Sequence, residues 1–225
     1  MDIFLTSIFL IVIVILLIYF ISKANIDNLY LILKIIFKKD SIVYSLISLL
    51  FFPGTLIHEL AHALMARILL LEVVRIRLIP QWKRNSITLG TVTYVKRGRL
   101  SGVIVGIAPI FGGITVLYLI ARFHLFPSSD MKITILVGYL IVAISSTMFS
   151  SKQDLVDAVY AIPAFVFLFA TLYFGMRYMH LEKSSTLFIP LNKYLSTITD
   201  MLIFALFCQA ILLIVLYVVR KLLRR

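Results

Sequence analysis

Six long apolar stretches divide the chain, and they restrict its fold more than any other feature of the sequence. They cover residues 3–21, 41–71, 103–121, 133–149, 156–175 and 201–219. A helix needs about 20 apolar residues to cross a bilayer. Hydrophobic residues make up 62% of the 225 residues, whereas soluble domains are roughly half apolar. The sequence therefore predicts an all-α integral membrane protein with about six transmembrane helices, in a single polytopic membrane domain over residues 1–225.

The net charge of +12 is concentrated between these stretches. Lys and Arg collect in the cytoplasmic connections of membrane proteins, so topology explains the charge without a nucleic-acid partner. We expect the connection between the second and third stretches and the C-terminus to be cytoplasmic. The basic residues that indicate this are Arg67, Arg75, Arg77, Lys83, Arg84, Lys96, Arg97 and Arg99 in the connection and Arg220, Lys221, Arg224 and Arg225 at the C-terminus.

The second apolar stretch, residues 41–71, is long and is interrupted by Pro53-Gly54. Broken helices are tolerated in membranes where they line a polar cavity. Two arrangements remain open: the stretch crosses once with a break, or residues 41–52 form a half-helix that turns back. The lysines before it favour a cytoplasmic connection there, whereas a single crossing would leave them outside. They are Lys23, Lys34, Lys38 and Lys39.

Residues 73–102 differ from the apolar stretches and predict a small cytoplasmic β-hairpin, inserted between spans two and three. The segment VRIRLI alternates apolar and basic residues, and ITLGTVTYV is rich in β-branched and aromatic residues. KRNS between them is typical of a turn. The alternative is a basic loop that lies on anionic lipid.

The stretch GTLIHELAHALMARILLL, residues 54–71, places three ionisable side chains on an apolar helix. His58 and His62 are four residues apart, so both imidazoles project from one face. Two neutral imidazoles at this spacing bind zinc, and Glu59 lies beside them to take a proton from water. A single histidine on an apolar helix is usually a hydrogen-bonded core residue, but three ionisable groups without a shared partner are far more costly to bury. The motif therefore predicts a Zn²⁺ site.

A catalytic zinc usually has three protein ligands, so a third is expected. His124, His180 and Glu182 fall in connections predicted on the outer side, whereas the motif helix ends at cytoplasmic arginines. The acids of the cytoplasmic turn between spans four and five, Asp154 and Asp157, are the remaining candidates. Ser151-x-x-Asp154 also fits a helix N-terminal cap. Because zinc needs a third partner, we favour a ligand over a cap at Asp154.

These features resemble the site-2 protease family of intramembrane zinc metalloproteases. The resemblance is carried by PGTLIHELAHALMARILLLEVV, by the strand-rich segment after it, and by SKQDL at residues 151–155. It implies cleavage of another protein's transmembrane helix, with Glu59 as general base and His58, His62 and Asp154 as zinc ligands. The family's usual Asp-Gly pair is absent, since Leu155 follows Asp154 and Ala158 follows Asp157. The chain would be a divergent, minimal member without a regulatory peptide-binding domain.

Two other functions fit an HExxH motif in a membrane helix. A zinc or divalent metal transporter would line its pathway with further intramembrane ligands, and the other spans contain almost none. A non-catalytic membrane protein that keeps a metal site is the second. For the protease, we expect a multi-pass protein of a prokaryotic cell membrane with a cytoplasmic C-terminus. Its partners would be the lipid bilayer and a transmembrane protein substrate.

Overall fold

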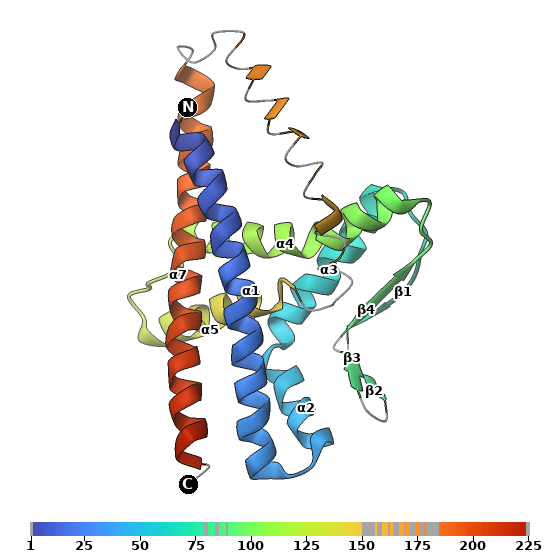
Figure 1. Ribbon diagram of the computed structural model, residues 1–225, viewed down its shortest axis with the longest axis vertical. Coiled ribbons are helices and arrows are strands. Elements are labelled where there is room, and N and C mark those ends of the chain that lie inside the picture. Colours follow the sequence, from blue (N-terminus) through green and yellow to red (C-terminus); the bar gives the residue numbers. More distant parts are fainter. Residues whose placement is uncertain are drawn as a thin grey trace.

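The computed structural model describes residues 2–78, 81–83, 86–88, 90–149 and 185–223, with separate positions between 156 and 178. It is mostly helical (Figure 1). The helices are α1 (Asp2–Phe37), α2 (Asp40–Leu50), α3 (Phe52–Ile68), α4 (Arg99–Arg122), α5 (Met131–Thr147) and α7 (Ser185–Leu223). The strands are β1 (Val73–Arg77), β2 (Gln81–Lys83), β3 (Ser86–Thr88) and β4 (Thr91–Tyr94).

Three described helices are long and apolar enough to cross a membrane: Thr6–Phe37, Leu100–Arg122 and Asn192–Leu223. The bent pair α2–α3 adds a fourth if it is one span. These helices indicate a membrane protein, but they do not establish the six spans that we expected. The apolar helix α5 has only 17 residues, and residues 156–175 are described only at separate positions.

The first helix is longer than the sequence indicated. The expected span ended at residue 21, but α1 has 36 residues and extends through Lys23 and Lys34 to Phe37. Long-stemmed lysines fit a helix well, so the end of the apolar run does not mark the end of the helix. Only residues 38–39 separate α1 from α2.

The predicted break in the second stretch is present. Helices α2 and α3 are bent by 71°, and the break falls at Phe51, with Pro53 in the first turn of α3. Proline favours a helix start, where its missing N–H is not needed. The hydroxyl of Tyr139 on α5 donates to the Leu50 carbonyl oxygen (2.6 Å), which gives this carbonyl at the break a partner.

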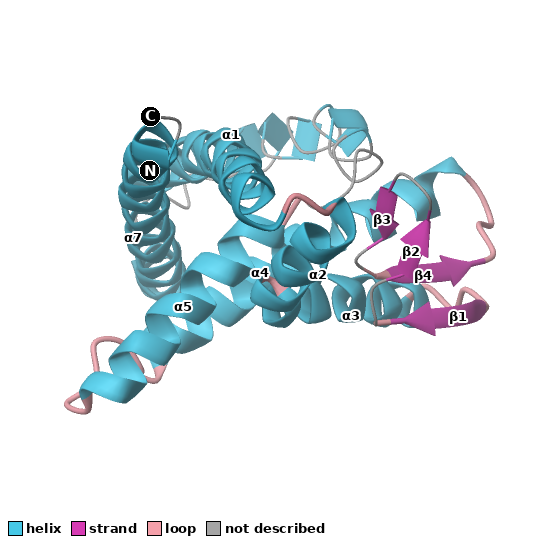
Figure 2. Ribbon diagram, turned by 90° about the horizontal axis from the view of Figure 1, so that it is seen from below, coloured by secondary structure: helices cyan, strands magenta, loops and turns pink. Residues whose placement is uncertain are grey.

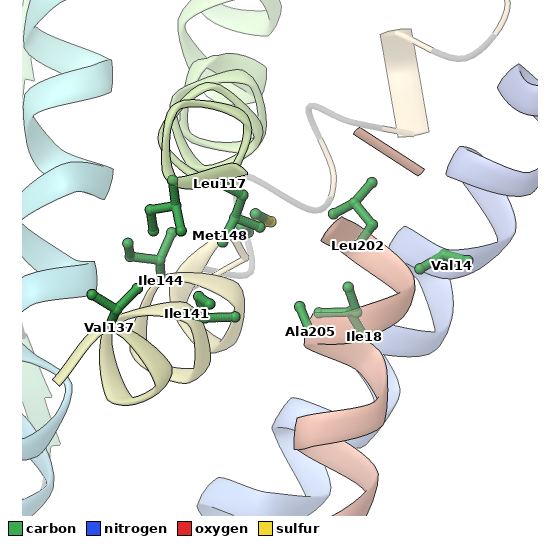
Figure 3. Close-up of a cluster of buried hydrophobic side chains, with 10 residues drawn as sticks. Val14, Ile18, Leu117, Val137, Ile141, Ile144, Met148, Leu202 and Ala205 are labelled. Carbon is green, nitrogen blue, oxygen red and sulfur yellow. The ribbon is translucent and has the colours of Figure 1, made fainter. Parts of the chain in front are cut away.

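Helices α1 and α7 run parallel and side by side (Figure 1). Toward the middle of this pair, Val14 and Ile18 on α1 lie close to Leu202 and Ala205 on α7. Further apolar residues of α4 and α5 extend the core (Figure 3). The helices α4 and α5 cross the α1–α7 pair steeply (Figure 2).

Gln209 on α7 joins three helices through hydrogen bonds and is fully buried, with 0% exposure. Its side-chain oxygen accepts from Asn25 Nδ2 on α1 (2.7 Å). Its amide nitrogen donates to the hydroxyls of Ser145 (2.9 Å) and Ser146 (2.6 Å) on α5. Hydrogen bonds between helices hold membrane proteins together where the hydrophobic effect cannot, so Gln209 fixes α5 against the α1–α7 pair.

The predicted β-hairpin is also present. Strand β1 pairs antiparallel with β4 from Val73↔Tyr94 to Arg77↔Thr91, and β2 pairs with β3 up to Lys83↔Ser86. The two residues between β2 and β3 lie outside the described part. Strands β1 and β4 lie beside α3 (Figure 2). The cytoplasmic location of the hairpin stays a prediction.

Candidate metal centre

Close packing with α4 and α5 fixes the position of the motif helix α3. A side chain on Gly54 would collide with the Ala143 carbonyl oxygen and the Thr147 hydroxyl of α5. A Cβ on Gly112 of α4 would lie 2.9 Å from the Cβ of Ala61. Small residues let membrane helices approach closely, so these two glycines hold α3 between its neighbours.

The two histidines of the motif face each other on adjacent turns of α3. His58 Nε2 and His62 Nε2 are 3.1 Å apart, and the rings are nearly perpendicular, at 86°. His58 is buried, with 3% of its surface exposed. The prediction that both imidazoles lie on one helix face is therefore confirmed.

The backbone of α4 determines the protonation of one ring. His62 Nδ1 lies 2.8 Å from the Val105 carbonyl oxygen, and because a carbonyl only accepts, Nδ1 carries the proton. Neutral His62 then has its lone pair on Nε2, the atom that faces His58. Metal-binding histidines are usually held in this way, with the other ring nitrogen donating to a carbonyl or carboxylate.

The arrangement of the two imidazoles suits a zinc ion. Two zinc–nitrogen bonds of about 2.1 Å at a tetrahedral angle hold their nitrogens about 3.4 Å apart, close to the observed 3.1 Å. Without a metal, the same distance fits a hydrogen bond from His58 Nε2 to His62 Nε2. The two imidazoles would therefore provide two of the three protein ligands that a catalytic zinc needs.

Glu59 lies against the β-hairpin, and the sequence did not indicate this contact. Its side chain is buried, with 6% exposure. A Cβ on Gly90, the residue before β4, would lie 2.8 Å from Glu59 Oε1 and also 2.8 Å from Cδ. A glycine inside a strand pattern is a signal of close backbone approach, and Gly90 within ITLGTVTYV gives that signal. The hairpin backbone thus covers the carboxyl group.

Asp154, the expected third metal ligand, lies outside the described part of the chain, as do Asp157, His180 and Glu182. Within the described residues, no three His, Cys, Asp or Glu side chains come together as a metal site. His124 follows the end of α4 that is distant from the histidine pair. Along the helix, Val105, which contacts His62, is about 25 Å from Arg122. Of the predicted site residues, the structure brings His58 and His62 together, and Glu59 lies against Gly90 of the hairpin.

No protein-family model, curated protein or solved structure matches this chain. The resemblance to the site-2 protease family therefore depends on the motifs of the chain itself.

For the peptide hydrolysis that the sequence predicts, replacing Gly90 with alanine should lower the activity, because the new Cβ would push either the hairpin or Glu59 away. Zinc content should not change, since the atoms nearest to the new Cβ all belong to Glu59. Gly138→Ala is the matched control, because its Cβ would meet only Phe126 at an ordinary 3.6 Å. Equal turnover of the two variants in a peptide-cleavage assay would contradict the proposed contact.

Proposed function

We propose that this chain is an intramembrane zinc metalloprotease that cleaves membrane-spanning protein substrates. The main support is the pair of facing Nε2 atoms of His58 and His62, 3.1 Å apart, with the buried carboxyl group of Glu59 on the next residue. The test is cleavage of a single-span membrane protein by the purified chain in liposomes, with Glu59→Gln as the matched variant.

Each residue of the site has a separate task in this reaction. His58 and His62 hold the zinc, and Val105 fixes the orientation of His62 through its carbonyl oxygen. Bound zinc supplies a Lewis acid that makes water acidic enough to act as a nucleophile near neutral pH. Glu59 accepts the proton of the attacking water and then donates it to the leaving amine nitrogen.

The hairpin is suited to hold an unwound substrate. A helical substrate must unfold locally before its peptide bonds are accessible, and an extended segment can pair with an exposed strand edge. Strand β4 begins at Thr91, directly after the glycine that lies against Glu59. A substrate strand laid along β4 would therefore run toward the carboxyl group that acts on water.

The arrangement of basic residues supports a re-entrant α2–α3 pair. Parallel α1 and α7 bring residues 38–39 to the same end as the basic C-terminus, which the positive-inside rule assigns to the cytoplasm. The same rule assigns the hairpin to the cytoplasm. The α2–α3 segment lies between residues 38–39 and the hairpin and is bent by 71°, so it starts and ends on the cytoplasmic side. We place the chain in a prokaryotic cell membrane as a multi-pass protein.

Cysteine labelling in intact cells tests this topology. In a Cys208→Ala background, an impermeant thiol reagent should fail to label Lys38→Cys, Leu100→Cys and Leu223→Cys until the membrane is permeabilised, because all three positions are cytoplasmic in this arrangement. His124→Cys, expected outside, is the positive control. Labelling of Leu100→Cys or Leu223→Cys from outside would contradict the positive-inside assignment, and labelling of Lys38→Cys alone would favour a single crossing.

Two aspartates compete for the third ligand position, and we propose Asp154. Its Ser-x-x-Asp pattern resembles that of divergent family members, whereas Asp157 suits a hydrogen bond to an imidazole N–H. Asp154→Ala should therefore reduce zinc affinity more strongly than Asp157→Ala, for which a loss of roughly 10–100-fold is expected. Zinc titration of both purified variants measures this. If Asp154→Ala binds zinc normally and Asp157→Ala does not, Asp157 is the third ligand.

A further inference from the structure

A group of basic residues meets at one end of the α1–α7 pair, although its members are far apart in the sequence. Asn25 on α1 bonds to Gln209 on α7, 184 residues later. Because the helices are parallel, the same offset places Lys38 level with Leu222. We call the resulting surface the basic end. It consists of Lys34, Lys38, Lys39, Arg220 and Lys221.

Two of these side chains already have partners in the protein. Lys34 forms an ion pair with Asp40 (2.5 Å), and Arg220 donates to Asn28 Oδ1 (2.7 Å). Lys38, Lys39 and Lys221 are exposed. Segments 34–40 and 220–223 contain five basic residues and one acidic residue, Asp40, so the basic end carries an excess of positive charge.

Exposed apolar and aromatic residues adjoin these lysines. Ile36 is 55% exposed, Tyr217 54% and Leu222 63%. Tyrosines and long basic side chains are enriched where a membrane helix passes from the acyl chains into the headgroups. Lysine stems lie along apolar surface and extend their ammonium groups toward water. A partner for this surface must therefore combine apolar chains with a negative charge.

We propose that the basic end binds the headgroup phosphates of anionic phospholipids. Groups of four to eight Lys and Arg next to a membrane helix attract such lipids. Here the group is assembled from two distant segments, so it depends on the parallel pairing of α1 and α7. The proposal is independent of the proposed protease activity.

Lipid titration of the detergent-solubilised full chain by native mass spectrometry tests this proposal. Phosphatidylglycerol should bind more tightly than phosphatidylcholine. The variant Lys38→Gln/Lys39→Gln/Lys221→Gln should bind phosphatidylglycerol about 100-fold more weakly, because each removed charge near the surface contributes several-fold. The single variant Lys221→Gln should show a loss of about 5-fold.

A matched control removes three exposed basic residues elsewhere: Arg122→Gln/Lys132→Gln/Lys193→Gln. It should bind phosphatidylglycerol as the unmodified chain does. Unchanged affinity in both the triple and the Lys221→Gln variants of the basic end would overturn the proposal, as would equal affinity for phosphatidylcholine. Displacement of the lipid by millimolar inorganic phosphate would indicate a site for free phosphate and would also overturn it.

Discussion

Glu59→Gln should abolish cleavage of a membrane-spanning substrate while leaving zinc bound. Glutamine has the size and shape of glutamate, so the packing of Gly90 against residue 59 is preserved. It cannot accept a proton from water, and loss of a general base lowers rates by about 10²–10⁴-fold. The measurement is turnover of a single-span protein in liposomes, with zinc content determined on the same preparation.

Two outcomes of this experiment would count against the proposed role of Glu59. Cleavage by Glu59→Gln at the unmodified rate would show that another group acts on water. Loss of zinc from Glu59→Gln would show that Glu59 is a ligand, in place of a base. Glu72→Gln, just beyond α3 in the sequence, is a control that should cleave normally.

The double variant His58→Ala/His62→Ala should lose its zinc. The two Nε2 atoms lie 3.1 Å apart and are the two expected imidazole ligands, so removing both rings leaves at most one protein ligand of the expected three. His124→Asn is the matched control, because His124 is exposed beyond the far end of α4. Its positive φ of 52° is one that asparagine tolerates.

Metal analysis after dialysis measures this effect. The unmodified chain and His124→Asn should each retain one zinc per chain, and the double variant should retain almost none. Full zinc retention by the double variant would contradict the proposal that His58 and His62 bind the zinc. Zinc retention by the unmodified chain, together with zinc flux across the membrane of liposomes that contain it, would favour the transporter.

The local features of the site were predictable because they depend on short sequence spacings. The i, i+4 spacing of His58 and His62 fixes their common face, whatever surrounds the helix. Pro53 marks the region of a helix start. The hairpin followed from strand periodicity on both sides of a turn. In each case, the determining residues lie within one element or two adjacent ones.

The remaining features depend on contacts between residues that are distant in the sequence. The Val105 carbonyl that orients His62 has no donor within α4, because Pro109, four residues later, lacks an N–H. The proline marks a free carbonyl in the sequence, but it does not show which side chain bonds to it. Gln209 lies in an apolar run whose periodicity does not reveal which helices it joins. The contact between Gly90 and Glu59 joins the hairpin to α3, and the sequence pattern of neither element predicts that they pack together. The extension of α1 through Lys23 was missed because hydropathy detects the apolar run, not the helix.

X-ray absorption spectroscopy of the zinc-loaded chain tests the central claim most directly, because it reports the atoms bound to the metal. We expect one tetrahedral zinc with two imidazole nitrogens at about 2.0–2.1 Å and oxygen ligands in the remaining positions. The imidazole contribution should disappear in His58→Ala/His62→Ala. A sulfur ligand, or an unchanged imidazole contribution in that variant, would contradict the claim that His58 and His62 hold the catalytic metal.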